Sequence, residues 1–303
     1  TGVQTCALPI FTGEARFGDL MELVLYNALL AGVSLSGDRF FYVNPLESDG
    51  SHHRKDWFQV SCCPMNAARL LASFRRYVYL RDDAGVYVNL YVSGEARLHF
   101  GDGPPLVFAQ SSKHPWSGSS RFTALTEVPR RLNLHLRLPS WSNGFSVYLN
   151  GVELKERRGE LCRRDGFIVI ERTWRNGDEL RLELPMDVEI IRAHPAVEAD
   201  SGLVAFKRGP LVYCAEQVDN DVPIRELMID PNGHYVARFE EELLGGCTVV
   251  TGDATRITPA GWENSLYKRA SEVSHESVRF TAIPYHLWDN REPGAMRVWI
   301  RER

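Results

Sequence analysis

The chain has 303 residues, of which 44% are hydrophobic, which is enough for about two domains with packed cores. The formal net charge is −4 with both signs well mixed, so neither a nucleic-acid partner nor an anionic membrane partner is expected. Every apolar run is far shorter than the roughly 18 residues of a membrane-spanning helix, and six cysteines, two of them adjacent, do not suggest a disulfide scaffold.

The first ten residues, Thr1–Ile10, show neither a helical nor a strand period. They match the translation of a common short-read sequencing adapter over ten codons. We therefore expect residues 1–10 to be an artefactual tail, and the natural protein to extend upstream of Phe11. Cys6 lies in this segment and is given no chemical role.

Two helices separated by a long loop are predicted before residue 78. Apolar residues at three- and four-residue spacing predict an amphipathic helix from Glu14 to Ala31. Its expected buried stripe is Phe17, Leu20, Val24, Ala28 and Ala31. Residues 32–60 lose this period and indicate a loop with a short strand or two. A second helix is predicted to begin at Pro64, because proline is well tolerated at the first helical position.

From about Tyr77 onward the apolar period is two, which is typical of half-buried strands. The clearest alternations are Leu132–Leu138 and Leu180–Ile190, and Asn150-Gly151 is a two-residue hairpin signal. Many short strands with turn signals between them predict antiparallel β-sandwiches. We therefore expect one β-sandwich region at residues 79–195 and a second at residues 196–303, with strands that can be shared between them.

The most specific motif is Ser61-Cys62-Cys63-Pro64, which places two thiols at the predicted start of a helix. The positive end of the helix dipole favours the thiolate, the nucleophilic and metal-binding form. Two cysteines supply only part of a zinc shell, and His52 and His53 are further candidates, although such a pair is more often simply solvated. From the residues alone, a reactive pair and a buried structural pair both remain open.

Other residues carry weaker signals. Three loop carboxylates have a conceivable acid/base role, with solvated side chains as the favoured interpretation: Glu47, Asp49 and Asp56. Three cysteines near apolar strands are expected to be small buried side chains: Cys162, Cys214 and Cys247. Four tryptophans offer stacking surfaces for sugars, although filling a core is their commoner role: Trp57, Trp116, Trp141 and Trp288.

A series of motifs then runs in order along the chain. They include Leu25-Tyr26-Asn27, Phe40-Phe41-Tyr42-Val43-Asn44-Pro45-Leu46, Cys62-Cys63-Pro64, Leu138-Pro139-Ser140-Trp141 and Arg208-Gly209-Pro210-Leu211. Through these motifs the chain from Phe11 to Arg303 resembles the C-terminal part of the bacterial β-L-arabinofuranosidase family, glycoside hydrolase family 127. The resemblance implies an α+β multidomain fold, with residues 11–78 as the C-terminal part of an (α/α)6 catalytic barrel followed by β-sandwich domains.

The resemblance also implies a function. It implies a retaining glycosidase that releases terminal β-L-arabinofuranose from an arabinose-containing oligosaccharide or glycan. In that family the first cysteine of the pair is the nucleophile and both bind Zn²⁺, so Cys62 and Cys63 inherit these roles, and Tyr42 matches a tyrosine of the sugar pocket. The acid/base glutamate and two further zinc ligands precede Phe11 in the family pattern, so this chain alone is expected to be inactive.

Two other functions stay open at this stage. One is a related glycosidase with a different sugar specificity, and the other is a non-catalytic, carbohydrate-associated β-sandwich module. Gln4-Thr5-Cys6 mimics the family's zinc-binding Glu-Thr-Cys motif but is not counted as a ligand set, because it has Gln for Glu and lies in the tail. A homo-oligomer is left open, as is the choice between bacterial cytoplasm and periplasm.

Overall fold

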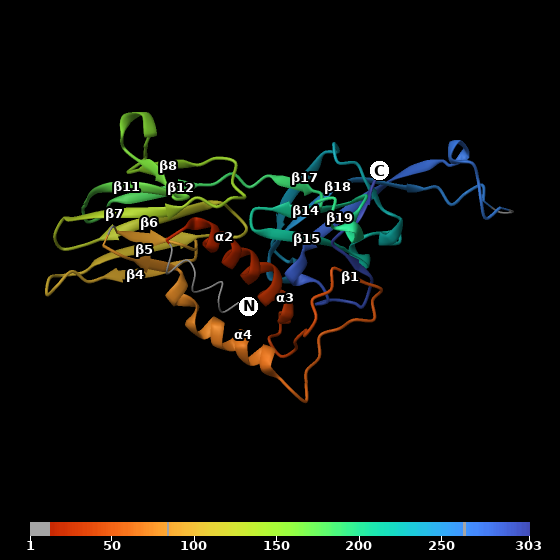
Figure 1. Ribbon diagram of the computed structural model, residues 1–303, viewed down its shortest axis with the longest axis horizontal. Coiled ribbons are helices and arrows are strands. Elements are labelled where there is room, and N and C mark those ends of the chain that lie inside the picture. Colours follow the sequence, from red (N-terminus) through yellow and green to blue (C-terminus); the bar gives the residue numbers. More distant parts are fainter. Residues whose placement is uncertain (1–12, 84, 263–264) are drawn as a thin grey trace. The chain divides into compact units, whose positions relative to one another are not determined.

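The computed structural model describes residues 13–83, 85–262 and 265–303. The predicted tail, residues 1–10, lies outside the described residues. The chain forms two compact units, each built from two segments (Figure 1). The first unit joins Thr1–Leu25, as far as it is described, to Ser61–Met186, and the second joins Tyr26–Val60 to Asp187–Arg303. This division differs from the expected contiguous regions, because the helical segment is shared between the units.

A helical run from Ala15 to Gly32 confirms the first predicted helix. It comprises α2 (Ala15–Val24), a π-helical stretch η1 (Leu25–Leu29) and α3 (Leu30–Gly32). The predicted buried stripe was wrong for four of its five members, because Phe17, Leu20, Val24 and Ala28 are half-buried or exposed and only Ala31 is buried. The buried face of α2 consists instead of Ala15, Gly18, Met21 and Glu22.

Close approach explains this choice of face. A Cβ atom at Gly18 would lie 2.7 Å from Cδ of Arg137, so a larger residue there would push α2 away from the strand that carries this arginine. The second helix, α4 (Cys62–Ser73), begins two residues earlier than predicted and continues into the 3₁₀ turn η2 (Phe74–Tyr77). Pro64 lies in its first turn, where the missing N–H has no intrahelical partner to lose.

The rest of the first unit is a β-sandwich, as predicted. One sheet has the order β10-β11-β7-β3-β2 and the other β4-β5-β6-β12-β8-β9. Their inward side chains, among them Phe108, Leu134 and Trp174, form one core cluster. Pairing is antiparallel except between β3 and β7. The strands are β2 (Tyr79–Arg81), β3 (Val86–Val88), β4 (Gly94–Leu98), β5 (Leu106–Ser112), β6 (Ser119–Leu125), β7 (Arg130–Arg137), β8 (Ser146–Leu149), β9 (Val152–Glu153), β10 (Cys162–Arg164), β11 (Phe167–Trp174) and β12 (Glu179–Glu183), with the 3₁₀ turn η3 (Glu156–Arg158).

Two sequence signals in this unit had different outcomes. The Asn150-Gly151 hairpin is confirmed: both residues have positive φ, 51° and 82°, and Leu149 faces Val152 across the turn. The single strand predicted for Leu180–Ile190 was wrong. It divides around Pro185 into β12, which pairs with β6 and β8, and β13 (Val188–Ile191), which pairs with β14 of the second unit.

The second unit contains a closed β-barrel, where a second sandwich was expected. Its ring runs β15-β19-β18-β16-β21-β14 and closes because β14 also pairs with β15. Closure pairs the backbone N–H and C=O groups that would be left unpaired at the edges of an open sheet. The barrel strands are β14 (Leu203–Arg208), β15 (Leu211–Glu216), β16 (Met228–Ile229), β18 (Cys247–Ile257), β19 (His275–Pro284) and β21 (Ile300–Glu302), and attached to them are β1 (Glu47–Ser48), β13, β17 (Tyr235–Glu240) and β20 (Met296–Arg297).

Short 3₁₀ turns connect these strands. They are η4 (Glu198–Asp200), η5 (Gln217–Asp219), η6 (Ile224–Glu226), η7 (Leu243–Gly245), η8 (Ala270–Glu272) and η9 (Tyr285–Leu287). Among the described residues, every helix is too short or too polar to cross a bilayer. The mixed α+β class is as predicted, whereas the assignment of residues 11–78 to an (α/α)6 barrel stays a prediction.

Candidate active site

Cys62 and Cys63 open α4, and both side chains are exposed. Their sulfur atoms lie 3.7 Å apart, far beyond the roughly 2.05 Å of a disulfide, so they are two separate thiols. The first turn reads Cys-Cys-Pro-Met and contains no carboxylate to neutralise the positive end of the helix. Of the two interpretations that the sequence left open, exposure of both side chains in the described residues favours the reactive pair.

The geometry of this first turn is fixed locally. The Asn66 side-chain amide donates a hydrogen bond of 2.9 Å to the carbonyl oxygen of Cys62, one turn earlier. The hydrogen bond between the two thiols raises the pKa of Cys63 above its ordinary value. Leu70 of α4 and Phe74 of η2 pack against Met21 of α2 and against Leu90. The pair is therefore presented by a helix that is anchored to its own unit.

The sulfur separation can be tested against a zinc shell. A tetrahedral site with Zn–S bonds of about 2.3 Å requires sulfur atoms about 3.8 Å apart, close to the observed 3.7 Å. The two thiols therefore fit two of four tetrahedral positions. Within residues 13–83, 85–262 and 265–303, no group of three or more His, Cys, Asp or Glu side chains is arranged to hold a metal ion.

His52 and His53 have other partners in the second unit. Nδ1 of His53 lies 2.6 Å from a carboxylate oxygen of Asp289, and Nε2 of His52 lies 3.0 Å from the carbonyl oxygen of Val43. The ring of His52 also stacks on Phe41, with centroids 4.7 Å apart. Each histidine side chain therefore has a structural partner within the second unit.

Tyr42 belongs to the second unit, whereas the cysteine pair belongs to the first. Its hydroxyl donates a hydrogen bond to the carbonyl oxygen of Val60, which precedes Cys62 by two residues in the chain. Its ring packs edge-on against Phe58, with centroids 4.5 Å apart, and 37% of the residue is exposed. Tyr42 therefore combines a fixed hydroxyl with an accessible ring face.

The segment that carries Tyr42 is held by Arg54, a residue that sequence analysis missed. Arg54 is buried, and its guanidinium donates to the carbonyl oxygens of Trp288 at 2.6 Å and Ala31 at 2.8 Å. It also lies 4.3 Å from the centroid of the Phe41 ring. Burial lowers the pKa of Arg54 to about 10, although the negative charge of Asp289 acts to raise it. A single arginine in a polar loop gives no sequence signal for such a role.

A second missed feature is the buried ion network under α2. Glu22 accepts hydrogen bonds from Arg137 at 2.7 Å, from His114 at 3.0 Å and from the Trp141 indole at 2.9 Å. Burial alone would raise the pKa of Glu22, but Arg137 and the other donors lower it to about 2. Arg137 also pairs with Asp19, one turn before Glu22. This network fixes α2 on the sandwich.

The remaining candidates have ordinary structural roles. Glu47 pairs with Arg297 in the β1–β20 contact, and Asp49 accepts hydrogen bonds from Ser51 that lower its pKa. Trp141 and Trp288 are buried, whereas Trp57 is exposed. Cys214 and Cys247 are buried as expected, and burial raises the pKa of Cys247 to about 11. The expectation of burial was wrong for Cys162, which lies exposed in the short strand β10.

The helices, the sandwich and the barrel define a multidomain α+β protein that carries a vicinal thiol pair at the start of a helix. Family models match three consecutive stretches of the chain. Residues 5–76 match the β-L-arabinofuranosidase GH127 catalytic domain, residues 85–186 the GH127 middle domain, and residues 188–301 the glycoside hydrolase family 127 C-terminal domain. The first match includes residues 5–10 of the predicted tail.

Individual relatives agree with this match. The chain is 37% identical, over 95% of its length, to a non-reducing end β-L-arabinofuranosidase of Bifidobacterium longum subsp. longum, of which it covers 46%. A solved GH127 β-L-arabinofuranosidase from Geobacillus stearothermophilus T6 superimposes with a TM-score of 0.90 at 37% identity, over 99% of this chain and 48% of that one. A solved GH127 β-arabinofuranosidase gives 0.88 at 33% identity, over 99% and 48%.

The chain therefore belongs to glycoside hydrolase family 127. It spans about half the length of the curated relative that it matches.

Proposed function

We propose that the chain is part of a retaining glycoside hydrolase that releases terminal β-L-arabinofuranose and uses Cys62 as its nucleophile. The observation that carries the proposal is the exposed Cys62-Cys63 pair in the first turn of α4, in a chain of this family. The fold is compatible with many chemistries, whereas two exposed thiols at a helix start specifically favour nucleophilic and metal-binding chemistry.

The reaction has two displacements. The Cys62 thiolate attacks the anomeric carbon, and a C–S bond forms as the C–O bond to the aglycone breaks. The leaving oxygen takes its proton from the acid/base glutamate, which the family resemblance assigns to a position before Phe11. Water, deprotonated by the same glutamate, then displaces Cys62, and the two inversions together retain the β configuration. The family resemblance assigns Tyr42 to the sugar pocket, where an aromatic ring and a hydroxyl group suit contact with a sugar.

We propose that Cys62 and Cys63 hold a Zn²⁺ ion together with two ligands from the preceding segment. The sulfur separation of 3.7 Å supports this assignment. When bound, the ion supplies positive charge that keeps its cysteine ligands deprotonated near neutral pH. Because the thiols occupy only half of a tetrahedral shell, we expect weak, substoichiometric zinc in this chain and tight zinc once the other two ligands are present.

We further propose that the helices of residues 11–78 are part of an (α/α)6 barrel. Ala67 is the buried residue of α4, while Met65 is 68% exposed and Leu71 45% exposed. On α2 the apolar stripe Phe17, Leu20 and Val24 lies outside the buried face. Both helices therefore leave apolar side chains exposed, and further helices of a barrel could pack against them.

Activity with matched variants tests the proposal. The chain with its upstream region restored is assayed for release of the aglycone from a synthetic β-L-arabinofuranoside. Cys62→Ala should abolish release, whereas Cys162→Ala, at another exposed cysteine, on β10, should leave it unchanged. Equal release by both variants, or no release by the restored enzyme, would contradict the assignment. Release of a different sugar would favour the related specificity considered above.

The 303-residue chain is assayed in parallel. We expect it to be inactive, because the acid/base glutamate is assigned to the preceding segment. Turnover by the chain alone that is lost on Cys62→Ala would show that this assignment is wrong. It would also exclude the alternative of a non-catalytic carbohydrate-associated module.

A further inference from the structure

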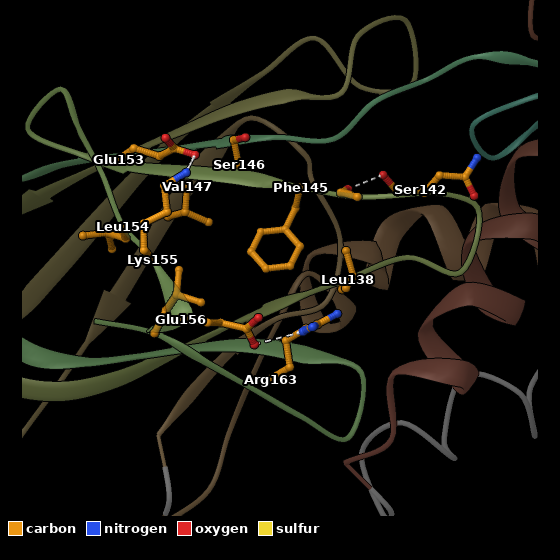
Figure 2. Close-up of a pocket in the computed structure, with 13 residues that line it drawn as sticks. Leu138, Ser142, Phe145, Ser146, Val147, Glu153, Leu154, Lys155, Glu156 and Arg163 are labelled. Carbon is orange, nitrogen blue, oxygen red and sulfur yellow. Dashed lines mark hydrogen bonds and ion pairs between the residues drawn. The ribbon is translucent and has the colours of Figure 1, made fainter. Parts of the chain in front are cut away.

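A pocket on the β-sandwich carries a second inference. It has a volume of about 430 Å³ and lies between the segment leading into β8 and the loop that joins β9 to β10 (Figure 2). This volume is within the range of about 300–1,000 Å³ that is typical of small-molecule sites. All of its lining residues belong to the first unit.

The ring of Phe145 forms the centre of this pocket. Figure 2 shows it directed into the cavity, with Leu154 and the Glu156–Arg163 pair around it. Phe145 is half-buried and packs against the sandwich core, which holds the ring in place, and the guanidinium carbon of Arg163 lies 6.0 Å from the ring centroid, at the rim. A rigid, half-buried aromatic ring offers an apolar surface at little cost in conformational entropy.

The charged groups at the rim cancel in pairs. Nε of Arg163 lies 3.0 Å from a carboxylate oxygen of Glu156, and Lys155 pairs with Glu153. An anion would face both carboxylates, and a cation would face both basic groups, so the rim selects against net charge. The same four side chains are more than one-third exposed and can exchange hydrogen bonds with neutral hydroxyl groups.

The rim is also preorganised by its backbone. The loop contains η3, which is capped at its C-terminal end by Gly159 with a left-handed φ of 67°. The backbone N–H of Lys155 donates a hydrogen bond of 2.9 Å to the Glu160 side chain, which closes the loop on itself. A preformed rim lowers the ordering cost of binding.

We propose that this pocket binds a neutral saccharide, with one sugar ring stacked on Phe145 and its hydroxyl groups bonded by the two rim ion pairs. A sugar ring has an apolar C–H face and a polar hydroxyl edge, which match the aromatic floor and the neutral, hydrogen-bonding rim. Binding here does not need Cys62, so the site would retain a glycan on the sandwich independently of hydrolysis. Only the choice of an arabinose-based probe rests on the proposed function.

Calorimetric titration of the 303-residue chain carrying Cys62→Ala tests this. The probes are linear arabinotriose and, as charged comparators, trigalacturonate and inorganic phosphate. We expect saturable binding of arabinotriose, weakened about tenfold by Phe145→Ala. The matched control is Phe100→Ala, which alters another half-buried ring that packs on the same core and has Arg81 4.8 Å from its centroid. This control should bind normally.

Three results would overturn the proposal: no binding of arabinotriose, equal losses in the Phe145 and Phe100 variants, or tighter binding of trigalacturonate or phosphate. If Phe145→Ala does not fold, Glu156→Gln at the exposed rim replaces it, with severalfold weaker binding expected and unchanged affinity contradicting the site. Binding in the Cys62→Ala chain is measured without turnover. If the hydrolysis assay fails, the binding result still stands. If binding fails, the hydrolysis result still stands.

Discussion

The buried pair of Glu22 and Arg137 gives the sharpest test of how α2 is held. In Glu22→Gln the three donors that converge on the carboxylate lose their charged acceptor, and Arg137 keeps Asp19 as its carboxylate partner. Removing one member of a buried pair costs about 3–5 kcal/mol. Because Asp19 still compensates Arg137, we expect the lower end, a loss of about 3 kcal/mol in the free energy of unfolding.

The pH dependence gives a second estimate of the same size. The folded state lowers the pKa of Glu22 from 4.5 to about 2, which at 1.36 kcal/mol per unit corresponds to about 3 kcal/mol. Since the folded pKa is the lower one, this stability is present above about pH 4.5 and is lost as the pH falls toward 2. The difference between the native chain and Glu22→Gln should therefore shrink across that interval.

The assay is the urea dependence of hydrogen exchange in a peptide covering β7, which reports on the first unit alone. Glu171→Gln is the matched control, because its pair with Arg131 lies on the same sheet, is exposed, and should contribute less than about 1 kcal/mol. A loss below about 1 kcal/mol in Glu22→Gln, or one equal to the control, would refute the reasoning. So would a difference that does not change between pH 5 and pH 3.

Three further predictions concern the second unit and the cysteines. Arg54→Met should destabilise residues 40–58 by about 2–3 kcal/mol, seen as faster hydrogen exchange, whereas Lys55→Met at the exposed neighbour should not; equal effects would contradict the role of Arg54. Asn27→Ala should cost about 1–2 kcal/mol in the urea dependence of exchange in β15, because Asn27 bonds Pro210 O and Val212 N; an unchanged transition would oppose this. Iodoacetamide should label the exposed thiols of the native chain, which are Cys62, Cys63 and Cys162, as read by peptide mass spectrometry. The buried thiols, Cys214 and Cys247, should be labelled only after unfolding. Labelling of either buried thiol in the native chain would contradict the fold.

Local patterns predicted the local features well. The period of two located most strands, the Asn150-Gly151 signal gave a hairpin with the expected positive φ angles, and the Cys62-Cys63 pair was expected at a helix start. Each of these depends on residues close together in the chain. The exact start of α4 differed by two residues, because a proline is tolerated anywhere in the first turn.

Features set by distant residues could not be predicted in this way. The buried face of α2 depends on Arg137, which lies 115 residues from Glu22, and without that partner a buried glutamate is unfavourable. Barrel closure depends on β14 pairing with both β15 and β21, which no alternation of apolar residues encodes. Arg54 likewise acts through carbonyl oxygens more than 230 residues away.

Detection of a covalent intermediate tests the central claim most directly. The chain with its upstream region restored is quenched in acid during turnover of a β-L-arabinofuranoside, and its peptides are analysed by mass spectrometry. The account predicts a mass increase of one pentosyl residue on Cys62, with Cys63 unmodified. A pentosyl group on a carboxylate, or turnover with inversion and no adduct, would contradict it.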